Sequence, residues 1–128
     1  MRRIALLLVI VASLPAACSG PAAELAPVNG RVFYRGRPLA GGTIVFTPDP
    51  ERGGRGPQAV AEIDAQGRYA LSTGGKPGAV PGWHVITIAS PAGSGGAGLP
   101  GRYRDPDLSR QRAEVKRDQA NRCDLYLD

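Results

Sequence analysis

The sequence predicts an all-β domain over residues 28–128, built as a seven-stranded antiparallel β-sandwich. Short runs in which apolar and polar residues alternate follow one another along the chain, and glycine and proline clusters separate them. No stretch repeats an apolar residue with the 3.6-residue period of an amphipathic helix. Seven short strands in about 100 residues indicate two packed sheets.

Each predicted strand is an alternating run bounded by turn-forming residues. In chain order the runs are 28–34, 42–47, 58–63, 68–72, 83–89, 111–116 and 122–127. Asn29-Gly30 is a pair typical of hairpins, but no strand precedes it, so we place it within the first run. Asp64 and Gly67 occupy the first and fourth positions of a tight turn. There the carboxylate accepts hydrogen bonds from turn amides and glycine tolerates positive φ.

The last run alternates strictly and places a cysteine in phase with leucines. Cys123, Leu125 and Leu127 share one face, and Asp124, Tyr126 and Asp128 share the other. A free cysteine behaves as a small core hydrophobe. We therefore expect Cys123 to be a buried strand residue; a disulfide or a reactive thiol is the alternative.

The first residues of the chain predict export. Arg2 and Arg3 precede an apolar run that begins at Ile4, and small residues lead to Cys18, as in a secretory signal. The apolar segment ends at Leu14 and is shorter than the roughly 20 residues of a membrane span. We predict a signal peptide over residues 1–17. A tether over residues 18–27 would reach at most about 30 Å beyond the cysteine.

Small residues directly before a cysteine resemble the bacterial lipobox, in which the thiol is acylated. The resemblance implies that Cys18 carries the lipid and anchors the domain outside the cytoplasm, on the cell membrane or the outer membrane. Leu14 lies four places before Cys18, whereas the lipobox usually has leucine three places before it. The alternative is an ordinary signal peptide cut nearby, which would leave Cys18 as a free thiol.

Composition argues against a nucleic-acid partner. The chain carries a net charge of +5, and two of its 16 basic residues, Arg2 and Arg3, would leave with the signal. The remaining basic residues are interspersed with acidic ones, and one Trp, four Tyr and two Phe are spread over the whole chain. Neither a basic run nor an aromatic cluster suited to base stacking is present in the sequence.

Several motifs occur in a recognisable order. They are residues 28–46, Asp64-x-x-Gly67-x-Tyr69, Pro81-Gly82 followed by 83–88, Leu99-Pro100-x-x-Tyr103-x-Asp105-Pro106, and 121–127. Together they resemble the carboxypeptidase regulatory-like, or transthyretin-like, domain of small bacterial lipoproteins, with His84 where that domain usually has tyrosine. The resemblance covers residues 28–127. It implies a transthyretin-like sandwich and an accessory role without catalysis, because in carboxypeptidases a separate domain carries the enzyme.

Candidate chemical groups are few. His84 is the only histidine, which excludes metal sites built from two or three imidazoles. It lies in phase with Ile86 and Ile88, so we expect a packed core residue rather than a base for Ser72 or Ser90. The acidic pairs Asp49/Glu51 and Asp105/Asp107 offer oxygens of the kind that calcium binds, but solvated loop charges are the preferred interpretation. We expect no catalytic residue, metal or cofactor.

Trp83 is the remaining candidate for a contact residue. It lies on the strand face opposite Ile86, where it either packs over the sheet or stands exposed as a platform for a sugar ring or a protein. We favour packing. The sequence thus predicts a non-catalytic, lipid-anchored module that acts by binding or by its position at the membrane surface, with an envelope protein or a polysaccharide as the partner. The alternative is a carbohydrate-binding module that uses Trp83 and the end loops.

Overall fold

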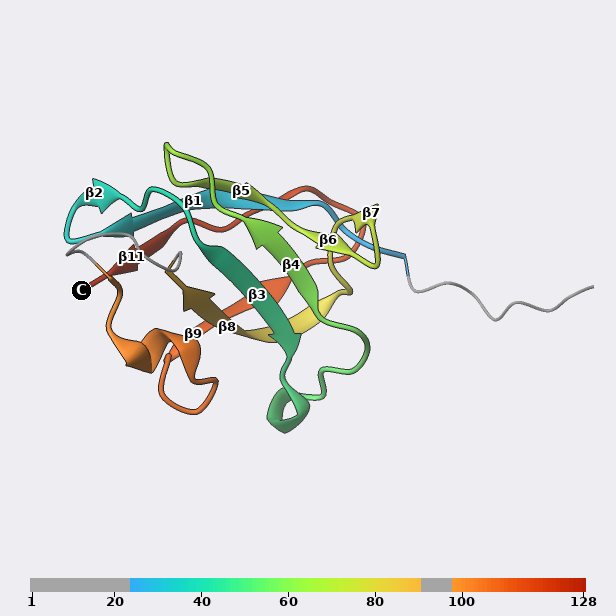
Figure 1. The fold of residues 1–128 in the computed structure, drawn as a ribbon. Helices are drawn as coiled ribbons and strands as arrows, with labels where there is room; N and C mark the ends of the chain where they lie inside the picture. The colour runs from blue at the N-terminus through green and yellow to red at the C-terminus, as the bar shows by residue number, and fades with distance from the viewer. Residues whose placement is uncertain (1–23, 91–97) are drawn as a thin grey trace, which may run out of the picture.

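The computed structural model describes residues 24–90 and 98–128 (Figure 1). The predicted signal peptide and Cys18 lie outside these residues. Strands dominate the described part, which contains only two short 3-10 helices, η1 (Pro50–Arg52) and η2 (Gly101–Arg104). The prediction of an all-β domain made of two packed sheets is confirmed.

The larger sheet has six strands in the order β7-β6-β4-β3-β8-β9, and every pairing in it is antiparallel. Its strands are β3 (Thr43–Pro48), β4 (Ala59–Glu62), β6 (Ser72–Thr73), β7 (Lys76–Pro77), β8 (Gly82–Ala89) and β9 (Gln111–Val115). β3 and β8 make the longest pairing, which runs from Thr43 opposite Ala89 to Pro48 opposite His84. In the sheet this pair lies between β4 and the edge strand β9.

The smaller sheet is built around β1 (Val28–Tyr34). β2 (Arg37–Pro38) and β5 (Arg68–Ala70) pair with it antiparallel, whereas β10 (Asn121–Arg122) and β11 (Leu125–Leu127) pair with it parallel. The expectation of a purely antiparallel sandwich is therefore wrong for this sheet. After β9 the chain crosses from the larger sheet and returns beside β1 in the same direction (Figure 1).

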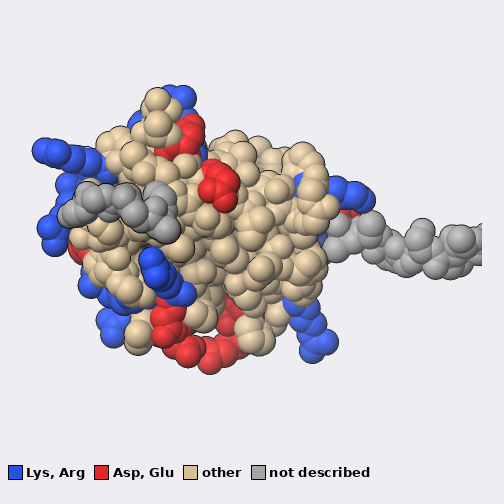
Figure 2. Space-filling model, viewed as in Figure 1, with Lys and Arg blue, Asp and Glu red and all other residues tan. Residues whose placement is uncertain are grey.

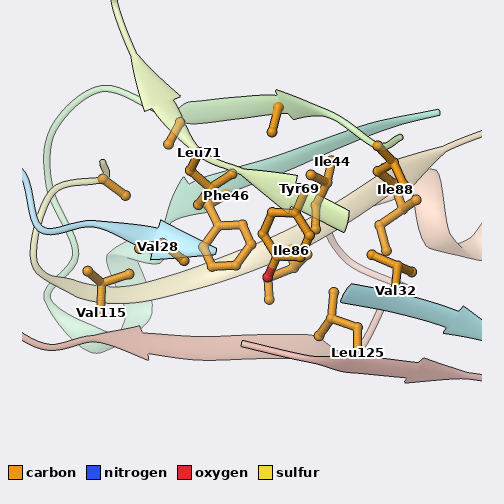
Figure 3. Close-up of a cluster of buried hydrophobic side chains, with 14 of the residues drawn as sticks. Val28, Val32, Ile44, Phe46, Tyr69, Leu71, Ile86, Ile88, Val115 and Leu125 are labelled. Atoms are coloured by element: carbon orange, nitrogen blue, oxygen red, sulfur yellow. The ribbon is translucent and has the colours of Figure 1, made fainter. Parts of the chain in front are cut away.

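The core lies between the sheets and is built from the inward-facing residues of both. Val32, Ile44, Phe46, Ile86 and Ile88 are almost fully buried, because each lies on the inward phase of its strand. Figure 3 shows the rings of Phe46 and Tyr69 at the centre of this cluster, with centroids 6.3 Å apart. The aliphatic side chains pack around these two rings.

The fold begins slightly before the predicted boundary. Ala26 is 3% exposed and forms an isolated antiparallel bridge with Ala79. The backbone amide of Asn121 donates to the carbonyl oxygen of Pro27 at 2.8 Å. Residues 26 and 27, which the sequence assigns to the tether, are therefore part of the packed domain.

The last predicted run, 122–127, is interrupted between β10 and β11, although both segments keep the same register with β1. At the interruption the Cys123 carbonyl oxygen accepts a hydrogen bond from the Tyr69 hydroxyl. The Arg31 amide instead donates to the Asp124 carboxylate at 2.9 Å. Side chains thus replace one step of the backbone ladder. This break and several two-residue strands beside turns explain why the structure has eleven strand segments where we expected seven.

Candidate functional site

Trp83 is half-buried beneath the loop that follows β3. The Arg52 guanidinium lies over its ring, 4.6 Å from the centroid, and the Trp83 carbonyl oxygen accepts a hydrogen bond from the Asp49 amide at 2.9 Å. Asp49 caps η1 by accepting from the Glu51 amide at 3.1 Å. One face of the Trp83 ring is consequently occupied by a residue of the chain itself, which favours the packing interpretation over a free platform.

One member of the acidic pairs, Asp49, is not a solvated charge. Asp49 is 2% exposed, and its Oδ2 lies 3.3 Å from Nε of Arg112, so the expectation of a solvated charge is wrong for this residue. The loop folds back on itself, because the Gly54 amide donates to the Asp49 carbonyl oxygen at 2.7 Å. Glu51 is exposed, as expected.

Glu51 and Asp107, one from each predicted pair, line a common hollow of 170 Å³ together with Arg112. Figure 2 shows carboxylates gathered along this lower edge of the molecule and basic side chains gathered at the end where β2 lies. Asp105 turns its own carboxylate to the Asp107 amide at 2.8 Å. Within residues 24–90 and 98–128, no three His, Cys, Asp or Glu side chains are grouped to hold a metal ion.

His84 is completely buried, as the strand phase predicted. Its Nε2 lies 2.8 Å from the Val80 carbonyl oxygen, and its ring packs against Phe46 with centroids 5.8 Å apart. Since a carbonyl can only accept, Nε2 carries the proton of the neutral ring. Burial lowers the pKa of His84, while the hydrogen bond to Val80 opposes that shift. The imidazole is a neutral core residue at pH 7.

Cys123 differs in part from its predicted environment. It is a free, half-buried thiol that packs against the core from the break between β10 and β11. We expected full burial within a strand. The Cys123 amide still donates to the Asn29 carbonyl oxygen of β1 at 2.8 Å, but its own carbonyl turns toward Tyr69 and leaves the ladder. Burial raises the pKa of the Cys123 thiol, and the nearby Tyr69 hydroxyl opposes that shift. The thiol lines a hollow of 250 Å³ beside Val115 and Asn121.

The outer face of the smaller sheet carries an aromatic pair that the sequence reasoning missed. Phe33 of β1 and Tyr126 of β11 stack with ring centroids 5.1 Å apart and an interplanar angle of 5°. The Arg31 guanidinium lies 5.1 Å from the Phe33 centroid, and Tyr126 is 72% exposed. Both rings fall on the outward phase of their strands, which the sequence does show. Only the parallel register, Phe33 opposite Tyr126, brings them together.

A hollow of 270 Å³ lies next to this aromatic pair and is bordered by three arginines, Arg31, Arg68 and Arg122. The guanidinium of Arg31 donates to the Gln66 carbonyl oxygen through Nε and a terminal nitrogen, at 3.3 and 3.0 Å. Gln66 belongs to the predicted turn, which the structure confirms. There Asp64 Oδ1 accepts from the amides of Gln66 and Arg68, both at 2.9 Å. The turn therefore fixes the position of the Arg31 charge.

In comparisons with known proteins, no protein-family model, curated protein or solved structure matches the chain significantly. Among the described residues, no helix is long and apolar enough to cross a membrane.

Proposed function

We propose that this protein is an exported lipoprotein whose β-sandwich acts by binding, or by its position, at the outer side of a cell-envelope membrane. Cys18 would carry the lipid, and an envelope protein or a polysaccharide would be the partner. The observation that carries the proposal is the short distance along the chain between Cys18 and the fold. Ala26 already pairs with Ala79, so only residues 19–25 separate the lipid site from the packed domain.

The environment of the chain's reactive groups supports binding rather than catalysis. The single histidine is neutral and sealed in the core, where it cannot exchange a proton with a bound substrate. Asp49 is committed to Arg112 and to capping η1. The exposed features are instead an aromatic pair and arginines, which are groups typical of recognition surfaces.

We assign the sandwich to the carboxypeptidase regulatory-like, or transthyretin-like, family as part of the same proposal. The order of the motifs along the chain supports this assignment, as do two packed sheets and the Asp64 turn between β4 and β5. The carbohydrate-binding alternative through Trp83 has less support, because Arg52 covers that ring.

Mass spectrometry of the mature protein, isolated from the membrane fraction of a bacterial host, tests the anchor. We expect the mature chain to start at a diacylglyceryl-modified Cys18 and to require detergent for extraction. A Cys18→Ala variant should lack the lipid and lose the requirement for detergent. An unmodified wild-type product that begins elsewhere and fractionates without detergent would overturn the proposed anchor.

A further inference from the structure

The outer face of the smaller sheet combines positive charge with little to neutralise it. Arg31, Arg68 and Arg122 border its 270 Å³ hollow, and Asp124 is the acidic residue beside them. Asp124 lies 3.2 Å from Nε of Arg122. Among the described residues, no carboxylate lies within 4.0 Å of the guanidinium of Arg31 or Arg68. Within the described residues, Arg31 and Arg68 therefore have no carboxylate partner, although Nε and one terminal nitrogen of Arg31 already donate to the Gln66 carbonyl oxygen.

The aromatic pair continues this surface along β1. Phe33 contacts both the Arg31 guanidinium and the Tyr126 ring, so the stack is held in place by neighbouring residues of the sheet. Tyr126 ends the stack and is 72% exposed. An exposed aromatic ring with a fixed orientation is a surface on which the apolar face of a sugar ring can pack.

We propose that this face binds an anionic polysaccharide, with acidic groups held by Arg31 and Arg68 and a neighbouring sugar ring packed on Tyr126. Guanidinium groups suit carboxylates and sulfates because their planar donors can pair two oxygens at once. The hollow is slightly smaller than the roughly 300–1,000 Å³ of a site for a drug-sized molecule, so it fits a single sugar unit of a longer chain. The inference rests on the proposed binding function and names its ligand class and site.

Three features select a glycan over other anionic partners. The basic groups border one hollow of 270 Å³, whereas a nucleic-acid backbone is held by a long run of phosphate contacts. The aromatic pair lies beside that hollow on the flat side of the sheet, where a linear chain can contact both. Lastly, Tyr126 is the one exposed large hydrophobic side chain among the described residues of this face, which is too little apolar surface for insertion into a lipid layer.

Isothermal titration calorimetry of the full-length protein in detergent tests the proposal, with polygalacturonate and dextran sulfate as anionic probes and dextran as the neutral one. We expect saturable binding to at least one anionic glycan and none to dextran. Arg68→Gln should weaken that binding about 2- to 5-fold, as expected for an exposed charge contact. Tyr126→Ala should weaken it about 3- to 10-fold through loss of ring packing.

Arg55→Gln is the matched control. It removes the same charge from an exposed position in the loop between η1 and β4, which belongs to the larger sheet. Equal weakening by Arg55→Gln and Arg68→Gln would show that net charge alone attracts the glycan, and would overturn the site. Absence of binding to both anionic glycans, or binding to anionic phospholipid vesicles alone, would overturn it as well. These outcomes are separate from the state of Cys18, so the site and the anchor fail independently.

Discussion

His84 makes the stability of the domain depend on pH near 6.5, the ordinary pKa of histidine. No other side chain of the protein has its ordinary pKa in this range. The pKa of His84 is lowered by burial from its usual value near 6.5, so the unfolded chain takes up this proton at a higher pH than the native chain. The stabilisation that the neutral His84 gives the folded domain is fully present above the pKa of the unfolded chain. It is lost as the pH falls through 6.5 toward the lower pKa of the native protein. The loss is at most about 1.4 kcal/mol per pH unit.

Denaturant unfolding of the wild type between pH 7.5 and 5.0 checks this expectation, with His84→Gln as the comparison. The variant should be less stable at pH 7.5, but its stability should change little over the same interval. Since His84 is the chain's only histidine, a parallel decline in both proteins would contradict the assignment.

Among the secondary-structure elements, the break between β10 and β11 requires a glycine in β1. A Cβ atom at Gly30 would overlap the Cys123 carbonyl group, which turns inward to meet the Tyr69 hydroxyl. Gly30→Ala must therefore displace the carbonyl and break that hydrogen bond, leaving buried polar groups unpaired at a cost of about 1–3 kcal/mol. Gly101→Ala is the control, because a Cβ there meets no atom within 4 Å and φ is not positive.

Thermal unfolding of the two variants measures the difference. A lower Tm for Gly30→Ala with an unchanged Tm for Gly101→Ala is expected. Equal Tm values would show that the carbonyl of Cys123 can return to the regular ladder without cost.

The same break shows what sequence alternation can and cannot establish for a strand. Alternation correctly placed Leu125 and Leu127 in the core and Tyr126 outside it, because side-chain direction has a period of two. It did not reveal that the Cys123 carbonyl leaves the ladder, because this depends on Tyr69, a residue 54 positions earlier. The burial of Asp49 was missed for the same reason, since its partner Arg112 lies 63 positions away.

Across the whole molecule, the sequence predicted the fold class and the position of most strands but not how the ends of the chain meet. Apolar alternation has no direction, so it cannot distinguish a parallel return beside β1 from an antiparallel one. The aromatic pair depends on that direction, because Phe33 and Tyr126 lie opposite each other only in the observed register. A binding surface formed by distant strands therefore could not be found before the topology was known.

The start of the folded domain leads to the last prediction. A chain that begins at Glu24 should be as stable as the full-length protein, whereas a chain that begins at Val28 should be less stable. The chain that begins at Val28 lacks the two 2.9 Å backbone hydrogen bonds between Ala26 and Ala79. It also lacks the Pro27 carbonyl oxygen, which accepts a hydrogen bond from the Asn121 amide. Each buried group left unpaired costs about 1–3 kcal/mol, and each kcal/mol lowers Tm by about 4–8 °C in a domain of this size.

Calorimetric scans of both shortened chains and of the full-length protein provide the test. Equal Tm values for the two shortened chains would show that residues 26 and 27 add no stability and belong to the tether. A lower Tm for the chain that begins at Val28 would leave residues 19–25 as the linker, with a reach of at most about 25 Å. The domain would then lie directly above the membrane that Cys18 is proposed to enter, close enough for its faces to meet polymers bound at the same surface.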